Sequence, residues 1–260
     1  MSEPVVIEER DGAILRLVVN RPKQLNAMNA DVLAGLERPL RAAANDRTIR
    51  AILIEGAGDK AFVAGADIAE MANLGPREAE AVSHRTRATY HAIEACPQPV
   101  VAGIDGLCLG GGLELAIACD LRIASDRSRF GLPEVTLGVL PGGGGTARLA
   151  RLVGVAVAKR LSLTGEIVDA STALRMNLID ATHLAADFSN ALSQRMAKFA
   201  EMSPAALGRI KSLFNRIIWD GAEAAHELEK LSFAQCFATA DQREGMSAFT
   251  AKRPAQFTGD

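Results

Sequence analysis

Apolar and polar positions change their spacing along the chain, and this change predicts strands in the first part and helices later. VVIEER and AILRLVVN are rich in β-branched residues and flank Asp11-Gly12, a dipeptide that favours a tight hairpin turn. AILIEG (51–56) and PVVAGI (99–104) are too apolar for exposed strands and predict buried ones. LRIASD and SRF predict two more short strands around a turn.

Helical spacing appears in three stretches. The first runs from about 29 to 44, although Pro39 should kink or interrupt a helix there. The second begins near Pro76, because proline favours a first turn, and stops before the prolines at 97–99. From Gly145 onward the pattern is helical. Its clearest apolar stripe, typical of a core or of a subunit contact, comprises Leu207, Ile210, Phe214, Ile217 and Ile218.

These elements predict an α/β first two-thirds and a helical last third. A chain of 260 residues is near the upper limit for one hydrophobic core, so we expect one domain or one domain plus a small appendage. The composition is 48% hydrophobic with a net charge of −2, and no basic excess indicates nucleic-acid binding. No stretch has the length and apolarity of a membrane helix, and the N-terminal residues do not resemble a signal peptide. We therefore expect a soluble, cytoplasmic protein.

Cysteines and histidines give no pattern typical of a metal site. The histidines have neither HxxxH nor HExxH spacing, and the cysteines form no CxxC. We therefore predict no metal ion. The cysteines lie mostly in apolar segments and are expected to be buried reduced thiols: Cys96, Cys108, Cys119 and Cys236.

Three consecutive glycines (110–112) lead into an apolar, helix-like stretch in the segment GLCLGGGLELAIACD (106–120). They can simply form a tight turn between a strand and a helix. Alternatively, they leave backbone N–H groups bare at a helix N-terminus, where an anion or a developing oxyanion would bind. Glu114 lies one turn into this apolar helix. A buried carboxylate there needs either a hidden arginine or a chemical role.

A second carboxylate, Glu134, occurs in a similar setting in FGLPEVTLGVLPGGGGT. Two such glutamates beside bare backbone indicate acid–base chemistry next to an oxyanion site. The segment KAFVAGADIAEM (60–71) is another loop of small residues, and its backbone could supply a second oxyanion donor. GGGGTA (142–147) also fits a dinucleotide-binding turn, but Pro141 precedes it and no clear strand ending in an acidic residue follows.

Together these segments resemble the enoyl-CoA hydratase/isomerase (crotonase) family. The resemblance implies a spiral of ββα repeats over residues 1–190, which would contain the coenzyme A (CoA) groove and the active site. It also implies a helical trimerisation region over 191–260 and assembly as a homo-trimer or homo-hexamer. The matching pieces are NRPKQLNAM, AFVAGADIAEM, PVVAGIDGLCLGGGLELAIACD, FGLPEVTLGVLPGGGGT and EGMSAFTAKR.

The resemblance also implies roles for individual residues. The backbone N–H groups of Ala66 and Gly111 would hold the thioester oxygen as an enolate. Members that resemble true hydratases carry glutamates at both positions matching Glu114 and Glu134, as this chain does. Glu114 would act as the base toward water and Glu134 as the acid toward C2, with coupled titrations because they share one water. The Gly142 backbone would help to position that water.

The same resemblance places CoA, which is part of the substrate, so no separate cofactor is expected. Many relatives have a lysine where this chain has Ala69, so we expect the phosphate contact to be absent or to come from Arg21 or Lys23. Phe249 and Lys252 match residues that often reach CoA from a neighbouring subunit. The full set matched to the CoA groove is Lys23, Leu25, Ala64, Asp67, Ile68, Phe249 and Lys252.

The favoured function is therefore the reversible hydration of a trans-2-enoyl-CoA to a 3-hydroxyacyl-CoA. The nearest alternative is another acyl-CoA enzyme of the same fold, such as an isomerase, a specialised dehydratase, a hydrolase or a lyase. A different class would be a non-catalytic RNA-binding or scaffold member, which the neutral charge and the intact glutamate pair disfavour.

Overall fold

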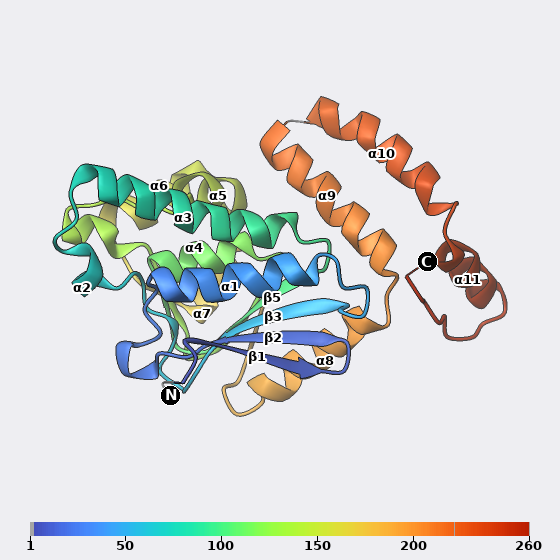
Figure 1. Cartoon of the computed structure of the whole chain (residues 1–260), viewed down its shortest axis with the longest axis horizontal. Coiled ribbons are helices and arrows are strands. Elements are labelled where there is room, and N and C mark those ends of the chain that lie inside the picture. Colours follow the sequence, from blue (N-terminus) through green and yellow to red (C-terminus); the bar gives the residue numbers. More distant parts are fainter. Residues whose placement is uncertain (1–2, 221, 260) are drawn as a thin grey trace.

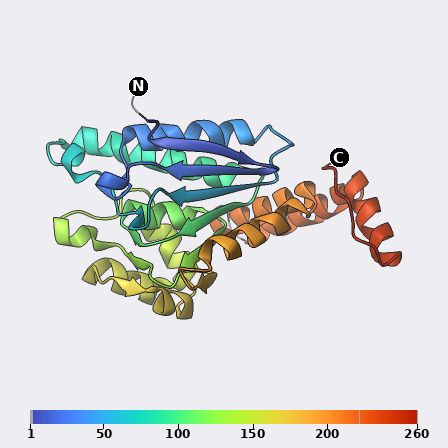
Figure 2. The same ribbon diagram turned by 90° about the horizontal axis from the view of Figure 1, so that it is seen from below.

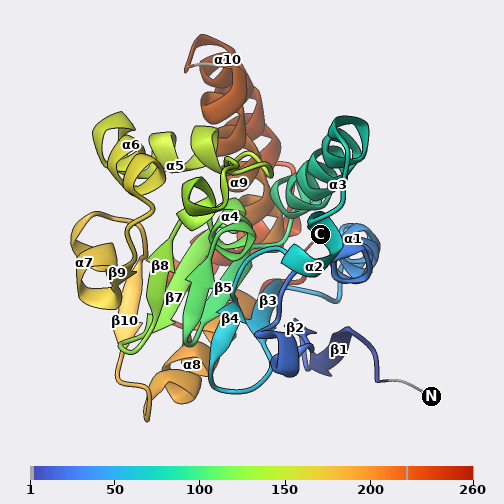
Figure 3. The same ribbon diagram turned by 90° about the vertical axis from the view of Figure 1, so that its left-hand side faces the viewer.

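The computed structural model describes residues 3–220 and 222–259, without the side chains of 218–227. Its strands form two sheets, one of six strands in the order β1-β2-β3-β5-β7-β10 and one of four in the order β4-β6-β8-β9. The two sheets lie inside a layer of helices, and the last helices extend away from them (Figures 1, 2 and 3).

The six-stranded sheet begins with the predicted hairpin. β1 (Val6–Asp11) pairs antiparallel with β2 (Ile14–Val19), and Gly12 has the positive φ of +55° that this turn requires. The following strands are parallel to their neighbours. They are β3 (Ala51–Gly56), β5 (Val100–Ile104), β7 (Leu121–Ser125) and β10 (Ala181–His183).

The four-stranded sheet is made of very short strands. β4 (Ala61–Val63), β6 (Leu107–Leu109) and β8 (Arg129–Gly131) are parallel, and β9 (Val168–Asp169) pairs antiparallel with β8. The chain therefore adds one strand to each sheet and then a helix, in the repeats β3-β4-α3, β5-β6-α4 and β7-β8-α5. This confirms the predicted spiral of ββα repeats. β9 and β10 correct the prediction that everything after Gly145 is helical.

The helices of the spiral begin and end close to the predicted residues. The Asn29 side chain accepts a hydrogen bond from the Val32 N–H and caps the first helix, which Pro39 does not end. The Pro76 helix begins and ends as predicted. The elements are η1 (Pro22–Gln24), α1 (Ala30–Ala43), α2 (Ile68–Met71), α3 (Pro76–Ala95), α4 (Gly111–Ala118), η2 (Pro133–Leu137), α5 (Gly145–Val153), α6 (Val155–Thr164) and α7 (Ala170–Arg175).

α8 (Phe188–Ala200) packs on the six-stranded sheet. Phe188, Leu192 and Met196 form a cluster with side chains from β2, β3, β5 and β7. The predicted boundary between residues 190 and 191 therefore lies inside a helix that contacts the sheet. The division into a core and an oligomerisation region stays a prediction.

Three helices, α9 (Pro204–Asp220), α10 (Ala222–Cys236) and α11 (Ala240–Thr250), form the arm that projects from the spiral (Figures 1 and 2). Lys211 attaches α9 to the core, because its Nζ donates to the carbonyls of Ile93 and Gln98 and lies 2.7 Å from the Asp120 carboxylate. The apolar stripe of α9 is exposed in the single chain, with Ile210 at 52% and Phe214 at 62%. The side chain of Ile218, part of the predicted stripe, lies outside the described residues.

The cysteines are free thiols. Cys96, Cys108 and Cys119 are buried, as predicted, and Cys236 is partly buried. Burial raises the pKa of Cys119 to about 12. Among the described residues, no group of three or more His, Cys, Asp and Glu side chains could hold a metal ion. In the same part of the chain, no helix is both long enough and apolar enough to cross a membrane.

Candidate active site

The three glycines at the start of α4 serve different purposes. Gly110 has φ +51°, which favours glycine. A Cβ on Gly112 would lie 2.0 Å from the Val63 carbonyl oxygen, so glycine is required for α4 to pack on β4. A Cβ on Gly111 would meet nothing closer than 3.7 Å, and the nearest atom is the Ala66 amide nitrogen. The fold therefore explains Gly110 and Gly112, whereas the bare backbone of Gly111 faces that of Ala66.

The peptide of Ala66 is oriented by its neighbours on both sides. The Met28 N–H donates to the Gly65 carbonyl, and the Asp67 N–H donates to the Met28 carbonyl, each at 2.8 Å. Within the described residues, the Ala66 N–H itself donates to no backbone carbonyl. The Ala66 amide nitrogen therefore lies close to the first residue of α4, whose own N–H has no earlier helical residue to bond to.

Tyr90 of α3 holds the first peptide of α4. Its side chain is fully buried, and its hydroxyl donates to the Gly111 carbonyl at 2.7 Å. Burial raises the pKa of Tyr90 well above its usual value, so the phenol stays a protonated donor. This contact could not be predicted from the sequence, because Tyr90 has the spacing of an ordinary core residue.

Glu114 is 3% exposed and is held by the glycine loop at 142–145. Its Oε1 accepts hydrogen bonds from the Gly143 N–H at 2.9 Å and the Gly145 N–H at 2.7 Å. A Cβ on Gly145 would lie 2.7 Å from the same oxygen. The loop amides therefore bind a carboxylate of their own chain, so the dinucleotide interpretation of GGGGTA is wrong.

The pKa of Glu114 is raised to about 7, mainly by burial and also by the charge of Glu134, while the two amide hydrogen bonds and Arg148 oppose these effects. The hidden arginine considered for Glu114 is therefore nearby, although backbone amides make the direct contacts.

Glu134 lies in η2 and faces the same helix terminus. A Cβ on Gly110 would lie 3.2 Å from its Oε1. Its Oε2 is buried and has no hydrogen-bond partner among the described residues. Burial raises the pKa of Glu134 as well. The structure therefore brings together a carboxylate satisfied by amides and a second carboxylate, one of whose oxygens is unpaired among the residues that the structure describes.

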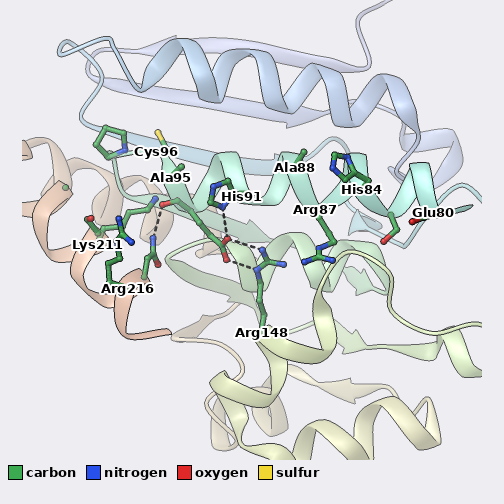
Figure 4. A pocket seen from close by; sticks show the side chains of 16 residues that line it. Glu80, His84, Arg87, Ala88, His91, Ala95, Cys96, Arg148, Lys211 and Arg216 are labelled. Carbon is green, nitrogen blue, oxygen red and sulfur yellow. Dashed lines mark hydrogen bonds and ion pairs between the residues drawn. The ribbon is translucent and has the colours of Figure 1, made fainter. Parts of the chain in front are cut away.

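Gly142 opens the loop that holds Glu114. Its carbonyl accepts a hydrogen bond from the Ser83 hydroxyl of α3 at 2.6 Å. Ser83 and Arg148 also line a groove of about 1100 Å³ between α3, α5 and α9 (Figure 4). Glu114 and Glu134 do not line this groove, so it lies behind the loop and not at the carboxylate pair.

Three of the residues matched to CoA lie along one paired segment. The Ala64 N–H donates to the Leu25 carbonyl at 3.1 Å, and the next residues form the bridge between Met28 and Ala66. Asp67 follows directly, and its carboxylate caps α2 through the Ala69 N–H. Ile68 is 51% exposed beside them.

Arg21 and Lys23 differ in how the loop uses them. The Arg21 guanidinium donates to the Asp67 carboxylate at 2.8 Å and to the Ala27 carbonyl at 2.6 Å. This hydrogen bond holds the pKa of Asp67 below its usual value. Lys23 is exposed. Of the two cations considered in place of a lysine at 69, Lys23 is the one that the loop leaves on the surface.

Phe249 and Lys252 lie apart from the other residues matched to CoA. Phe249 is in the last turn of α11 and Lys252 follows the helix directly, at the opposite end of the molecule from α2 (Figure 1). Phe249 is 86% exposed. A single chain therefore does not bring them to the Ala66–Gly111 site.

Tyr90, Glu94, Gly143, Gly145 and Arg148 contact the site or its supports but were not singled out from the sequence. Among these residues, only Gly143 and Gly145 had a sequence feature that pointed to the site, namely their place in a run of glycines.

Known proteins are similar to this chain in both fold and sequence. The Enoyl-CoA hydratase/isomerase family model matches residues 9–260. A short-chain-enoyl-CoA hydratase of Clostridium acetobutylicum is 39% identical over 248 residues, which cover 95% of each chain. A crotonyl-CoA hydratase of Syntrophomonas wolfei is 39% identical over 99% of each chain. The crystal structure of an enoyl-CoA hydratase from Bacillus anthracis is similar with a TM-score of 0.94 at 32% identity, covering 98% of this chain and 100% of that one. The chain belongs to the enoyl-CoA hydratase/isomerase family.

Gly111→Ala and Gly112→Ala are adjacent substitutions with different expected results. The Gly112→Ala methyl would clash with the Val63 carbonyl, so we expect a loss of stability on the order of 2 kcal/mol or more. The Gly111→Ala methyl fits but would cover the Ala66 amide. We expect a near wild-type melting temperature and a fall of about 10²- to 10³-fold in enoyl-CoA turnover. Calorimetry measures the change in stability, and the loss of thioester absorbance measures turnover. A fully active Gly111→Ala variant would contradict the prediction that the space beside the Ala66 amide is needed for turnover.

Glu114→Gln tests the energetic cost of the buried carboxylate. The pKa of Glu114 is raised from 4.5 to about 7 in the folded chain. Between these two pH values the folded chain therefore retains a proton on Glu114 that the unfolded chain has lost. The stability that the protonated form contributes is fully present below about pH 4.5 and is lost as the pH rises through about 7. The cost of the charge reaches on the order of 3 kcal/mol at pH 8.

We therefore expect Glu114→Gln to gain melting temperature over the wild type as the pH rises from 5 to 8. Differential scanning calorimetry at both pH values measures the difference. Glu201→Gln, at an exposed position on the surface, is the matched control and should show no such trend. A difference between Glu114→Gln and wild type that does not change with pH would contradict the prediction.

Proposed function

We propose that the protein catalyses the reversible hydration of a trans-2-enoyl-CoA to a 3-hydroxyacyl-CoA. The observation that carries this proposal is the buried Oε2 of Glu134, which has no hydrogen-bond partner in the described part of the chain, beside the amide-held carboxylate of Glu114. Burial raises the pKa of both groups, and the charge of Glu134 raises that of Glu114 further. Two carboxylates whose titrations are coupled in this way can provide an acid and a base together.

The chemistry follows from these positions. The two carboxylates hold one water over C3, and Glu114 accepts a proton from the water as its oxygen bonds to C3. The electron pair of the C2=C3 bond moves to the thioester oxygen, and the enolate is stabilised by the N–H groups of Ala66 and Gly111. Glu134 then donates its proton to C2. One water has been added, and proton exchange between the glutamates restores the starting state.

The arm of α9, α10 and α11 supports an oligomer as part of the proposal. Isolated exposed apolar residues are common, but a concentration of large ones on one segment indicates a contact surface. Phe249 and Lys252 would then reach CoA on a neighbouring copy. The exposed apolar residues on this arm include Ile210, Phe214, Ile217, Leu231, Phe233, Phe237, Met246 and Phe249.

Substitution of the two glutamates tests the hydration mechanism. Glu114→Gln and Glu134→Gln should each lower kcat for hydration by about 10²- to 10⁴-fold, because each removes one proton-transfer step. The double variant should lose much less than the product of the two single losses, because the glutamates act on one water. The assay is the loss of enoyl-thioester absorbance with a short trans-2-enoyl-CoA, and CoA-ester affinity should be retained.

The control for this assay is the free enoic acid, which lacks the CoA contacts and should not be turned over measurably. An isomerase relying on a single carboxylate would lose activity through one glutamate only. Hydration by Glu134→Gln at near wild-type rate would show the two-glutamate assignment to be wrong.

Assembly is tested by light scattering together with Lys252→Ala. We expect a trimer or hexamer for both the wild type and the variant, since Lys252 is exposed. CoA-ester affinity should fall roughly tenfold in the variant, as for the loss of one charged contact. Lys198→Ala removes another exposed lysine and should bind as the wild type does. A fully active monomer would exclude the shared site.

A further inference from the structure

Glu94 and Arg148 form an ion pair on the far side of the loop that holds Glu114. Arg148 Nε lies 2.7 Å from Glu94 Oε1, and its Nη2 donates to Glu94 Oε2 at 3.0 Å, as the dashed lines in Figure 4 show. Both side chains are largely buried, with Arg148 9% exposed and Glu94 13% exposed. A two-point contact of this kind fixes the plane of the guanidinium.

The same guanidinium contacts the glycine loop at 142–145 that holds Glu114. Arg148 Nη1 donates to the Gly143 carbonyl at 2.9 Å, while the Gly143 N–H donates to Glu114. One residue of the loop is therefore held through its carbonyl by Arg148 and holds Glu114 through its amide. Glu94 of α3 fixes Arg148, and Arg148 holds the Gly143 peptide that binds Glu114. The position of α3 therefore helps to determine where the Glu114 carboxylate of α4 lies.

Tyr90, one helical turn before Glu94, belongs to the same arrangement. Its hydroxyl holds the Gly111 carbonyl, and Arg148 lies 5.9 Å from the centre of its ring. One turn of α3 thus supports both the proposed oxyanion donor and the loop that holds the proposed base.

The charged and titratable groups around Glu114 come from several elements. Arg148 of α5 lowers the pKa of Glu114, and Glu134 of η2 raises it. Tyr90 of α3, on which the charge of Glu114 also acts, is buried with its pKa raised well above its usual range, and it remains neutral. Beyond Arg148 lies Glu94, whose Oε2 is 3.7 Å from His91 on the groove side.

We propose that Glu94 and Arg148 are positioning residues for Glu114: Arg148 holds the Gly143 peptide, and Glu94 holds Arg148 while balancing its charge. Neither residue touches the reacting atoms. The kinetic consequence rests on the proposed hydration, whereas the effect on the protonation of Glu114 does not depend on it.

The two residues have opposite charges, so their removal has opposite effects on Glu114. Arg148→Met removes a cation, which favours the protonated carboxyl, and should move the rising limb of the pH–kcat profile to higher pH. Glu94→Gln leaves the cation unbalanced and should move the limb to lower pH. Both variants loosen the loop, so both should lower kcat at the plateau, by about ten- to a hundredfold, the range seen when supports of metal ligands are removed. KM should change little.

Arg148→Lys separates position from charge. It keeps the cation but cannot make the two contacts to Glu94 and the contact to Gly143 together. We expect a limb close to the wild type and a plateau kcat between those of the wild type and Arg148→Met. Arg151→Met is the matched control, at an exposed position on the same helix, and should change neither quantity appreciably.

The experiment combines pH–kcat profiles on a short enoyl-CoA with a direct titration of Glu114 by NMR of carboxyl-labelled glutamate in the intact protein. A purely structural role would lower stability and activity without moving the Glu114 titration in opposite directions. If Arg148→Met does not fold, the proposal is still tested by Glu94→Gln, in which the titration of Glu114 should shift to lower pH. Wild-type pH behaviour in both variants, or shifts in the same direction, would overturn the proposal. If the wild type hydrated no enoyl-CoA, the proposed function would be wrong. The titration of Glu114 in the variants would still test the role of Glu94 and Arg148.

Discussion

The structure depends on one buried carboxylate. Glu114 lies in a helix whose other side chains are apolar, and a charge in such a place is tolerated only if polar groups satisfy it. The loop at 142–145 provides them, with two backbone N–H groups on Oε1. Glycine is needed there because the carboxylate occupies the space that a Cβ on Gly145 would take. The glycine run at 142–145 is explained by this requirement, and it leads directly into α5.

The two-sheet spiral explains why residues distant in sequence meet at this carboxylate. β4, β6 and β8 are adjacent parallel strands, so their carboxyl ends share one edge of the small sheet. Ala66 follows β4, Gly111 follows β6 and Glu134 follows β8. Each turn of the spiral thus contributes one group of the proposed site to the same edge.

Much of this could be predicted from the sequence, and the remainder has physical reasons. The Asp11-Gly12 hairpin, the Pro76 helix and the buried central strands follow from local turn residues and apolar runs. Strands of two or three residues such as β4, β9 and β10 carry too few positions to show a period. Glu114 and Glu134 were noticeable as charges in apolar runs. Arg148 was not, because its partner Glu94 is 54 residues away and only the packing of α3 on the glycine loop brings them together.

The same geometry limits what one chain can do. A spiral brings successive strand ends to one edge, but the substrate of the proposed reaction carries a long CoA moiety beyond its reacting atoms. Along that direction the chain offers the Leu25–Ala64 segment and the exposed Lys23, while Arg21 is held by Asp67. Phe249 and Lys252 lie at the other end of the molecule, on an arm with many exposed apolar side chains. An arm of this kind is stable when it is covered, and a second copy that covers it could also carry those two residues to the first copy's substrate. Completion of the site and burial of the arm would then be one event, so the energy that stabilises the assembly would also orient the thioester.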